Sequence, residues 1–241
     1  MSRILFISDL HLAPERPDII QLFERFLDKQ VRQATALYIL GDLVEYWLGD
    51  DDEARGLAST FDKIRQISDL GVAVFLMHGN RDFLMGKQLA KRLGCTLIDD
   101  PHVAQIDHQP VLLMHGDTLC TDDVDYQKLR AFLRNPAWQQ DFLSKPLAER
   151  IIMARALREK STEETRNKTV DIMDVNSQAV EQAFVKNNTR LLIHGHTHRP
   201  NIHQLVVNNQ SVTRIVLGDW YTHGSYLEFS NPDEYRLLAF H

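Results

Sequence analysis

The chain has 241 residues, of which 44% are hydrophobic and 25% are charged, and its formal net charge is −6. This composition is typical of a globular protein with a sizeable core and excludes disordered and fibrous chains. The first apolar run, Ile4 to Ile7, is too short for a signal peptide or a membrane span. Cys95 and Cys120 have no partner pair, which argues against a disulfide framework or a structural zinc site. We therefore expect one cytoplasmic domain, residues 1–241.

Short apolar runs recur along the chain, and each ends at a polar turn that contains Gly or His. They predict buried strands at 4–7, 36–40, 72–77, 111–114 and 191–193. Between the first three runs, apolar residues recur with helical spacing at 20–27 and 61–70. This alternation is typical of βαβ units and predicts an α/β fold in which β-sheets are flanked by helices.

From residue 122 to about 187 the strand pattern gives way to helical periodicity, which predicts a helical cap insertion on the layered body. Residues 128–168 within it hold ten Lys or Arg against five Asp or Glu. A basic segment in an acidic protein fits an anionic partner, or it is a solvated helix face. After the insertion the β pattern resumes at 206–207, 212–217 and 227–229, with Asn208-Asn209 as a hairpin turn.

Polar residues that can bind metal ions follow five of the predicted strands, where open α/β sheets place their ligand sites. They occur in the motifs Asp9-x-His11, Gly41-Asp42, Gly79-Asn80-Arg81-Asp82, His115-Gly116-Asp117 and Gly195-His196-x-His198. One such residue alone is usually a cap or a satisfied polar group. Five such turns together indicate a shared partner, because buried polar groups without one cost about 1–3 kcal/mol each.

Histidine, aspartate and asparagine donors without a thiolate favour Mn²⁺, Fe²⁺ or Zn²⁺ over Ca²⁺ or Mg²⁺. Seven potential ligands exceed what one tetrahedral ion needs and are enough for two. Two ions that share a bridging carboxylate can clamp the attacking and leaving oxygens of a phosphoryl transfer.

In their order along the chain these five motifs resemble those of the calcineurin-like metallophosphoesterase superfamily. The resemblance covers the chain apart from the helical insertion, and it implies that fold and a water activated by two metal ions. It further implies a metal site at Asp9, His11, Asp42 and His198, and another at Asp42, Asn80, His115 and His196, with Asp42 as the bridge. Asn80, Arg81 and His115 are the expected catalytic residues.

Arg81 departs from the superfamily pattern, which has a histidine acid at this position. An alkoxide leaving group needs a proton, whereas a phosphate monoester, whose second pKa is about 6, does not. Arg81 is therefore compatible with diphosphate cleavage, in which its guanidinium stabilises charge through bidentate contacts. The alternative is that Arg81 forms only a surface ion pair.

Longer motifs are similar to the bacterial UDP-2,3-diacylglucosamine diphosphatase family of lipid A biosynthesis. They are Tyr38-Ile-Leu-Gly-Asp-Leu43, His78-Gly-Asn-Arg-Asp-Phe83, the stretch His115 to Asp123, and Ile172-Met-Asp-Val-Asn176. The similarity implies two Mn²⁺ ions and attack at the α-phosphorus, which yields UMP and 2,3-diacylglucosamine 1-phosphate (lipid X). It places substrate contacts at Asn80, Arg81, Asp123, Ser161, Thr165, Lys168 and His196.

The insertion contains more apolar residues than one thin helical layer can bury. They either form a groove for acyl chains, with Phe132, Phe142 and Ile152 among its lining, or belong to the core of the cap. Interleaved arginines suit the anionic cytoplasmic surface of the inner membrane, to which we expect peripheral attachment. We expect no nucleic acid and no obligate protein partner. A phosphoesterase for soluble substrates and a metal-free scaffold are the alternative functions.

Overall fold

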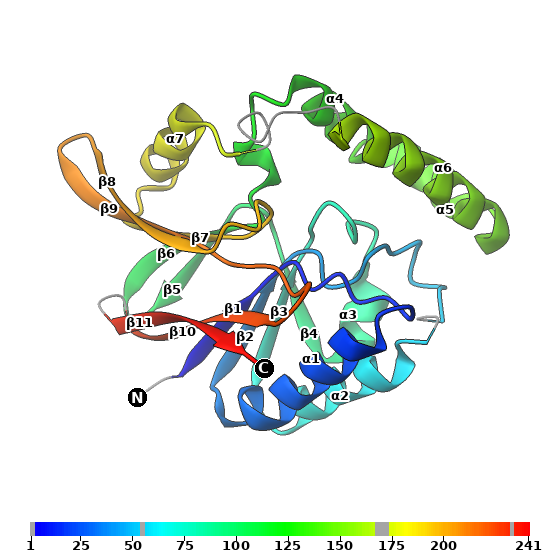
Figure 1. The fold of residues 1–241 in the computed structure, drawn as a ribbon, viewed down its shortest axis with the longest axis horizontal. Coiled ribbons are helices and arrows are strands. Elements are labelled where there is room, and N and C mark those ends of the chain that lie inside the picture. The colour runs from blue at the N-terminus through cyan, green and yellow to red at the C-terminus, as the bar shows by residue number, and fades with distance from the viewer. Residues whose placement is uncertain (1–2, 54–55, 167–173, 232–233) are drawn as a thin grey trace.

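A computed structural model describes residues 3–53, 56–166, 174–231 and 234–241. In the helix at residues 147–166, it describes the side chains as far as Leu157. It contains a six-stranded sheet in the order β11-β10-β1-β2-β3-β4 and a five-stranded sheet in the order β5-β6-β7-β9-β8. Both sheets and the helices around them are visible in Figure 1. The α/β class with sheets flanked by helices is therefore confirmed.

The six-stranded sheet combines a parallel centre with an antiparallel edge. Strands β1 to β4 are parallel, whereas β10 runs antiparallel to both β1 and β11. The strands are β1 (Ile4–Ile7), β2 (Ala36–Leu40), β3 (Ala73–Met77), β4 (Cys95–Ile98), β10 (Gly224–Asn231) and β11 (Glu234–Phe240). Helices α1 (Pro17–Lys29), α2 (Ala58–Asp69) and α3 (Lys87–Leu93) accompany this sheet, and the short η1 (Val31–Gln33) follows α1.

The five-stranded sheet has a parallel centre of β6, β7 and β9 with an antiparallel strand on each side. Its strands are β5 (His102–Ile106), β6 (Gln109–Met114), β7 (Leu191–His194), β8 (Asn201–Val207) and β9 (Gln210–Val216). Asn208 and Asn209, which join β8 to β9, have φ angles of 49° and 62°. Two successive left-handed residues are typical of a type I′ hairpin turn, so the predicted turn is confirmed.

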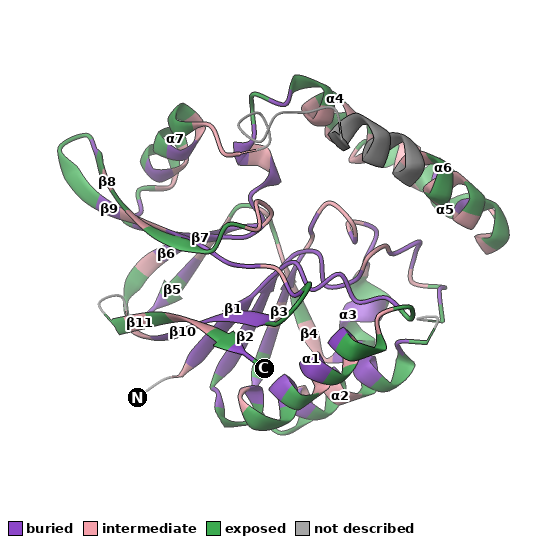
Figure 2. Cartoon of the chain, viewed as in Figure 1, coloured by how far each residue is buried: buried purple, intermediate pink, exposed green. Residues whose placement is uncertain are grey.

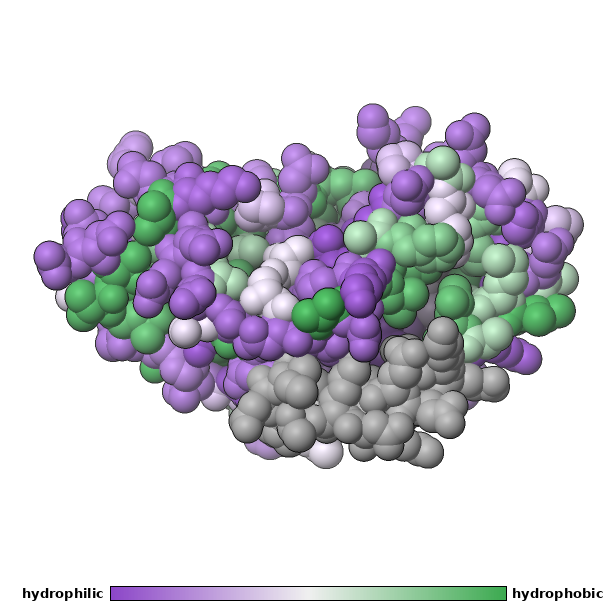
Figure 3. Space-filling model, turned by 90° about the horizontal axis from the view of Figure 1, so that it is seen from above, coloured by the Kyte–Doolittle hydropathy of each residue, from purple (hydrophilic) through white to green (hydrophobic). Residues whose placement is uncertain are grey.

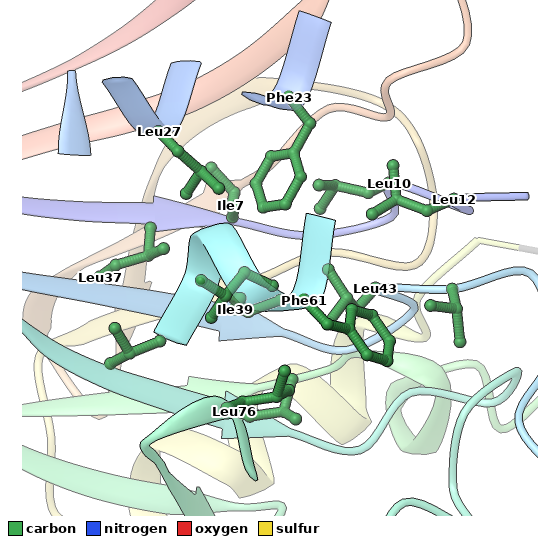
Figure 4. Close-up of a cluster of buried hydrophobic side chains, with 14 of the residues drawn as sticks. Ile7, Leu10, Leu12, Phe23, Leu27, Leu37, Ile39, Leu43, Phe61 and Leu76 are labelled. Carbon is green, nitrogen blue, oxygen red and sulfur yellow. The ribbon is translucent and has the colours of Figure 1, made fainter. Parts of the chain in front are cut away.

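Strand β1 divides its side chains between two hydrophobic clusters. Leu5 and Ile7 belong to a cluster with α1 and α2, whereas Ile4 and Phe6 belong to one that contains residues of both sheets. This follows from the alternation of side chains along a strand. Figure 4 shows the helix-side cluster, where Phe23 of α1 and Phe61 of α2 lie near Ile7 and Ile39. The central strands are therefore buried on both faces and hold the turns at their ends in place.

Residues 124–187 form the helices predicted for this stretch, apart from the part that the structure leaves undescribed. They are α4 (Val124–Leu133), α5 (Pro136–Ser144), α6 (Leu147–Arg166) and α7 (Ser177–Asn187), preceded by the short η2 (Asp117–Leu119). Helix α7 packs on the five-stranded sheet through Val180 and Phe184. Helices α4 to α6 project from the body in Figure 1, and the parts of them that the structure describes contain mostly exposed and intermediate residues in Figure 2. Whether they form a separate insertion remains a prediction.

Three strands were missed in the sequence. Strands β4, β5 and β11 contain partly exposed positions, and their apolar runs are short or interrupted. The apolar-run criterion detects strands that are buried on both faces and is weaker for edge strands, of which it found only β8. Strand β4 lies at one edge of its sheet, β11 at the other, and β5 at an edge of the second sheet.

Candidate metal centre and substrate cleft

The turns after β1, β2, β3, β6 and β7 bring the seven candidate ligands together. Carboxylate and imidazole atoms of Asp9, His11 and His198 lie within 4.8 Å of one another, as do those of Asp9, Asp42 and His115. Asn80 and His196 join the second group, because the amide Oδ1 of Asn80 lies 3.0 Å from His115 Nε2 and 2.9 Å from His196 Nδ1. The two sheets together therefore build one cluster of oxygen and nitrogen donors.

Five of these residues have a backbone conformation that non-glycine residues rarely adopt. The φ angles are 55° at Asp9, 49° at His11, 53° at Asp42, 69° at His196 and 55° at His198. A left-handed residue turns the chain sharply just after its strand, so the side chain points back toward the cluster. Such strained residues cluster at functional sites in proteins, and here they coincide with the candidate ligands.

Each buried carboxylate keeps one oxygen engaged with the protein. Asp9 Oδ2 accepts hydrogen bonds from Ser8 Oγ at 2.6 Å and from the backbone N–H of His196 at 2.9 Å. Asp42 Oδ1 accepts one from the backbone N–H of Arg81 at 2.8 Å. The other oxygens face the histidines, with Asp9 Oδ1 at 3.4 Å from His198 Nε2 and Asp42 Oδ2 at 3.8 Å from His11 Nε2.

Gly79 and Asp82 hold the turn after β3 against the turn after β2. Asp82 is fully buried and accepts hydrogen bonds from the backbone N–H groups of Gly79 and Leu43. A Cβ atom at Gly79 would overlap the carboxylate and the backbone nitrogen of Asp42, so only glycine allows this approach.

The cluster contains buried polar atoms that the protein leaves unsatisfied, which is the condition that a cation would relieve. Among the described residues, Asp9 Oδ1 and His11 Nε2 have no hydrogen-bond partner. An orphaned buried polar atom costs about 1–3 kcal/mol, and a charged one costs more. The donor set and these orphaned atoms fit divalent cations.

His115 shows the same demand for a cation. Its Nδ1 lies 2.9 Å from the carbonyl oxygen of Leu40, and its Nε2 faces Asn80 Oδ1, so both ring nitrogens face acceptors. Burial opposes the charged form, but the carboxylates of Asp42, Asp117 and Asp9 outweigh it and raise the pKa of His115 to about 9. Without a metal ion, this imidazole is therefore protonated on both ring nitrogens, and positively charged, at neutral pH.

The pKa values of three neighbouring ligand candidates are also shifted from their usual values. Burial raises the pKa of Asp42 to about 6, although His115 and His11 act to lower it. Burial and the nearby His115 lower the pKa of His196 to about 4, so its ring is neutral at pH 7. For Asp9, His198, His115 and His11 outweigh the effect of burial and hold the pKa well below its usual range.

Known proteins match the chain over nearly its whole length. A family profile described as calcineurin-like phosphoesterase matches residues 2–200. The chain belongs to the calcineurin-like phosphoesterase family. Proteins named UDP-2,3-diacylglucosamine hydrolase from Ectopseudomonas mendocina and Pseudomonas aeruginosa are each 51% identical over 225 residues, which are 93% of this chain and 93–94% of theirs. A solved archaeal phosphodiesterase shares the fold, with a TM-score of 0.50 and 16% identity over 99% of both chains.

In this family member, a cleft of about 700 Å³ connects the metal-ligand cluster to the helices α4 to α6. His11, Asn80 and Arg81 line it from the body. Its apolar lining from the helices is Leu129, Leu133, Trp138, Phe142, Ile151, Ala154 and Leu157. Figure 3 looks onto the face that carries α4 to α6 and shows apolar side chains gathered on the right of the view. The cleft therefore has both a polar floor and an apolar wall.

Of the three residues expected to line a groove for acyl chains, only one lines this cleft. Phe142 lines it and is only 2% exposed. Phe132 and Ile152 are absent from the lining among the described residues and are exposed by 55% and 69%. Helical periodicity identifies apolar faces of a helix but does not say which face meets the body.

Asp117 links helix α4 to the cluster. This buried carboxylate accepts hydrogen bonds from Tyr126 Oη at 2.8 Å and from Arg130 Nε at 2.6 Å. The ring of Tyr126 lies 5.9 Å from that of His196. Arg134, the residue directly after α4, donates to the carbonyl oxygen of Gly79 at 2.8 Å. Helix α4 is therefore held to the ligand-bearing turns by charged groups rather than by an apolar face.

The expected substrate contacts fall into two groups. Asn80, Arg81 and His196 lie at the cluster, whereas Asp123 caps α4 and accepts a hydrogen bond from the backbone N–H of Tyr126 at 3.1 Å. The side chains of Ser161 and Thr165 lie outside the described part of α6, and Lys168 lies outside the described residues.

Several residues at the site were missed in the sequence. Glu45 Oε2 lies 3.1 Å from His11 Nδ1, and its Oε1 lies 3.9 Å from Arg81 Nη1. Asp219 Oδ2 lies 3.7 Å from His198 Nδ1, and Tyr221 stacks on His11. Asp219 carried a usable signal, because Leu217-Gly-Asp219 repeats the pattern Leu40-Gly-Asp42 after another buried strand.

Proposed function

We propose that this protein hydrolyses the diphosphate bond of UDP-2,3-diacylglucosamine at the α-phosphorus, giving UMP and 2,3-diacylglucosamine 1-phosphate, a step of lipid A biosynthesis. The observation that carries the proposal is the cleft in which a metal-ligand cluster adjoins an apolar wall. The relatives that bear this activity in their names are half identical to the chain, which supports the substrate.

We assign two Mn²⁺ ions to the cluster. Asp9, His11, Asp42 and His198 would hold one, and Asp42, Asn80, His115 and His196 the other. Bound ions of this kind lower the pKa of water and stabilise charge on phosphoryl oxygens. The protein prepares the site by holding Asp9 Oδ2 and Asp42 Oδ1 with hydrogen bonds, which orients the remaining oxygens toward the histidines.

Arg81 binds and orients the diphosphate in this proposal. Its side chain lines the cleft beside Asn80, and only Glu45, at 3.9 Å, lies at ion-pair distance among the described residues. So loose an ion pair leaves the guanidinium able to turn toward phosphate oxygens, which it binds bidentately. The departing sugar 1-phosphate needs no proton, so an arginine can stand where a histidine acid is otherwise expected.

We further propose that α4 to α6 rest on the anionic surface of the inner membrane, from which the lipid substrate enters the cleft. The exposed apolar side chains Phe132, Leu143 and Ile152 lie on these helices, and Arg155 is exposed on α6. Among the described helices, none has the length and apolar character needed to cross a bilayer. Cosedimentation with phosphatidylglycerol vesicles, compared with phosphatidylcholine vesicles, tests this surface.

The experiment that tests the function follows UMP release from UDP-2,3-diacylglucosamine and from UDP-glucose. The protein is first treated with a chelator and then supplied with Mn²⁺, Mg²⁺ or no ion. We expect release from the lipid substrate alone and only with a divalent ion, with Mn²⁺ most effective. In ¹⁸O-labelled water, attack at the α-phosphorus places the label in UMP.

Each alternative has its own signature in this experiment. Label in the sugar phosphate would place the attack at the β-phosphorus. Equal turnover of UDP-glucose would indicate a phosphoesterase for soluble substrates. Absence of turnover with every ion would favour the scaffold function.

A further inference from the structure

One part of the cleft is lined by loops of the body rather than by helices α4 to α6. It contains Ala13, Glu15 and Arg16 from the loop after β1 and Tyr221 from the loop after β9. This region adjoins the ligand cluster, because the ring of Tyr221 lies 5.5 Å from that of His11 and 5.4 Å from that of His198. The proposed function gives it no role.

The connectivity of the substrate orders its parts along the cleft. In a nucleoside diphosphate lipid, the nucleoside is attached directly to the α-phosphorus, whereas the acyl chains lie beyond the second phosphate and the sugar. With the α-phosphorus at the metal ligands, ribose and base must therefore lie within a few bonds of the cluster. The acyl chains reach further, to the apolar wall of α4 to α6. Tyr221 is close enough to the cluster for the base.

Tyr221 has the geometry of a stacking platform. Its ring is nearly parallel to that of His11, with an interplanar angle of 15°, and the residue remains 45% exposed. Tyr126, the other tyrosine that contacts a ligand histidine, donates its hydroxyl to Asp117 within the network that holds α4. A planar ring supported on one face and open to the cleft can bind a nucleobase on its other face.

The loop that carries Tyr221 is fixed before any ligand binds. Arg16 Nη2 donates to the carbonyl oxygen of Tyr221 at 2.8 Å, while its guanidinium also pairs with Asp18. The backbone N–H of Tyr221 donates to Asp219 Oδ1 at 3.0 Å. The nearby Glu15 carboxylate is an acceptor and suits the donor hydroxyls of ribose.

We propose that Tyr221 is the platform on which the uracil base of the nucleotide half stacks, so that this region is a pyrimidine nucleotide subsite. This inference rests on the proposed function. Tyr221 thereby acts as a specificity-determining residue, because it strengthens the binding of substrates that have a planar base on the α-phosphate side. The lipid half is bound by helices α4 to α6.

Direct binding to the metal-loaded protein tests the subsite. Calorimetry compares UMP with ribose 5-phosphate, which keeps the phosphate and sugar but lacks the base, and with the diacylglucosamine 1-phosphate product. We expect the wild type to prefer UMP over ribose 5-phosphate by roughly 10-fold, the usual size of one base stacking on an aromatic ring. Tyr221→Ala should abolish this preference, whereas Tyr221→Phe should retain it.

Leu157→Ala, on the apolar wall, is the matched control. It should weaken binding of the lipid product and leave UMP binding unchanged, the reverse of Tyr221→Ala. Retention of the UMP preference in Tyr221→Ala would overturn the subsite. Equal loss of UMP and ribose 5-phosphate, together with loss of bound metal, would also overturn it, because Tyr221 would then only support His11 and His198. Failure of the wild type to hydrolyse the lipid nucleotide would instead count against the proposed function.

Discussion

The strand-end turns and the α4–α6 segment line the same cleft but are built in opposite ways. In the turns, Asp9, Asp42 and His115 are at most 2% exposed and are held by hydrogen bonds to the backbone. In the segment, none of the residues of α4, all of which the structure describes, is buried, and α5 buries only Phe142. The body holds the candidate metal ligands in fixed positions, whereas the helices contribute a wall of mostly unburied side chains.

The segment is attached to the body both through charged anchors and through apolar contacts, with Phe142 buried in the core cluster of the body. Arg130 pairs with Asp117, and the guanidinium of Arg150 binds both Asp51 and the carbonyl oxygen of Leu48. Arg150 is 1% exposed and thus a buried charge, which only its partners make tolerable. In α4, which buries no residue, such directional bonds set the position of the helix without an apolar interface.

The sharpest break between the two regions is expected at Asp42. Asp42→Asn removes the charge of the proposed bridging carboxylate and should abolish turnover of every substrate, because both metal ions are lost or misplaced. Steady-state kinetics with metal analysis checks this, and Asp62→Asn on the exposed face of α2 is the matched control. Retention of a tenth of the wild-type activity with two ions bound would rule out the bridge.

Arg81→Ala should lower turnover of the diphosphate lipid by roughly 100-fold, the usual effect of removing one charge-stabilising donor. Arg81→Lys should recover only part of it, since lysine cannot form the bidentate contact. Arg25→Ala, an exposed arginine of α1, serves as the control. Normal hydrolysis of the diphosphate by Arg81→Ala would contradict our account of the leaving group.

Substitutions at Phe142 and Ile152 compare a buried and an exposed apolar residue of the α4–α6 segment. Phe142→Ala removes a buried ring and should lower the free energy of unfolding by about 3–5 kcal/mol. Ile152→Ala, at a residue 69% exposed, should change it by at most about 0.5 kcal/mol. Denaturant unfolding measures both. Equal losses would mean that α6 is buried more deeply than the structure shows.

The smallest effect concerns protons. Because the pKa of His115 is raised to about 9, this imidazole is protonated between pH 6 and 8 and must lose its proton to bind an ion. Affinity for Mn²⁺ should therefore rise by about tenfold per pH unit and level off above the pKa. Calorimetry in two buffers of different ionisation enthalpy detects the released proton, and His223→Ala should release as many. An affinity independent of pH would contradict this protonation state.

The sequence and the structure agree where a segment is buried on both faces. The runs 4–7 and 36–40 coincide with β1 and β2, because parallel strands between two layers contain continuous apolar residues. The candidate ligands could also be predicted from the sequence, since each lies in the turn that follows such a strand. Tyr221 and Arg150 could not be found, because their roles depend on contacts between loops and helices far apart in the chain. No local pattern encodes those contacts.

The left-handed backbone at Asp9, His11, Asp42, His196 and His198 has a consequence for engineering. Each non-glycine residue in this conformation costs about 1–2 kcal/mol, which glycine would largely avoid. A screen for thermal stability alone would therefore favour glycine at these five positions and remove the ligands one by one. Variants selected for heat resistance should be sorted by retained metal content as well, because at this site greater stability and lost activity can arise from the same substitution.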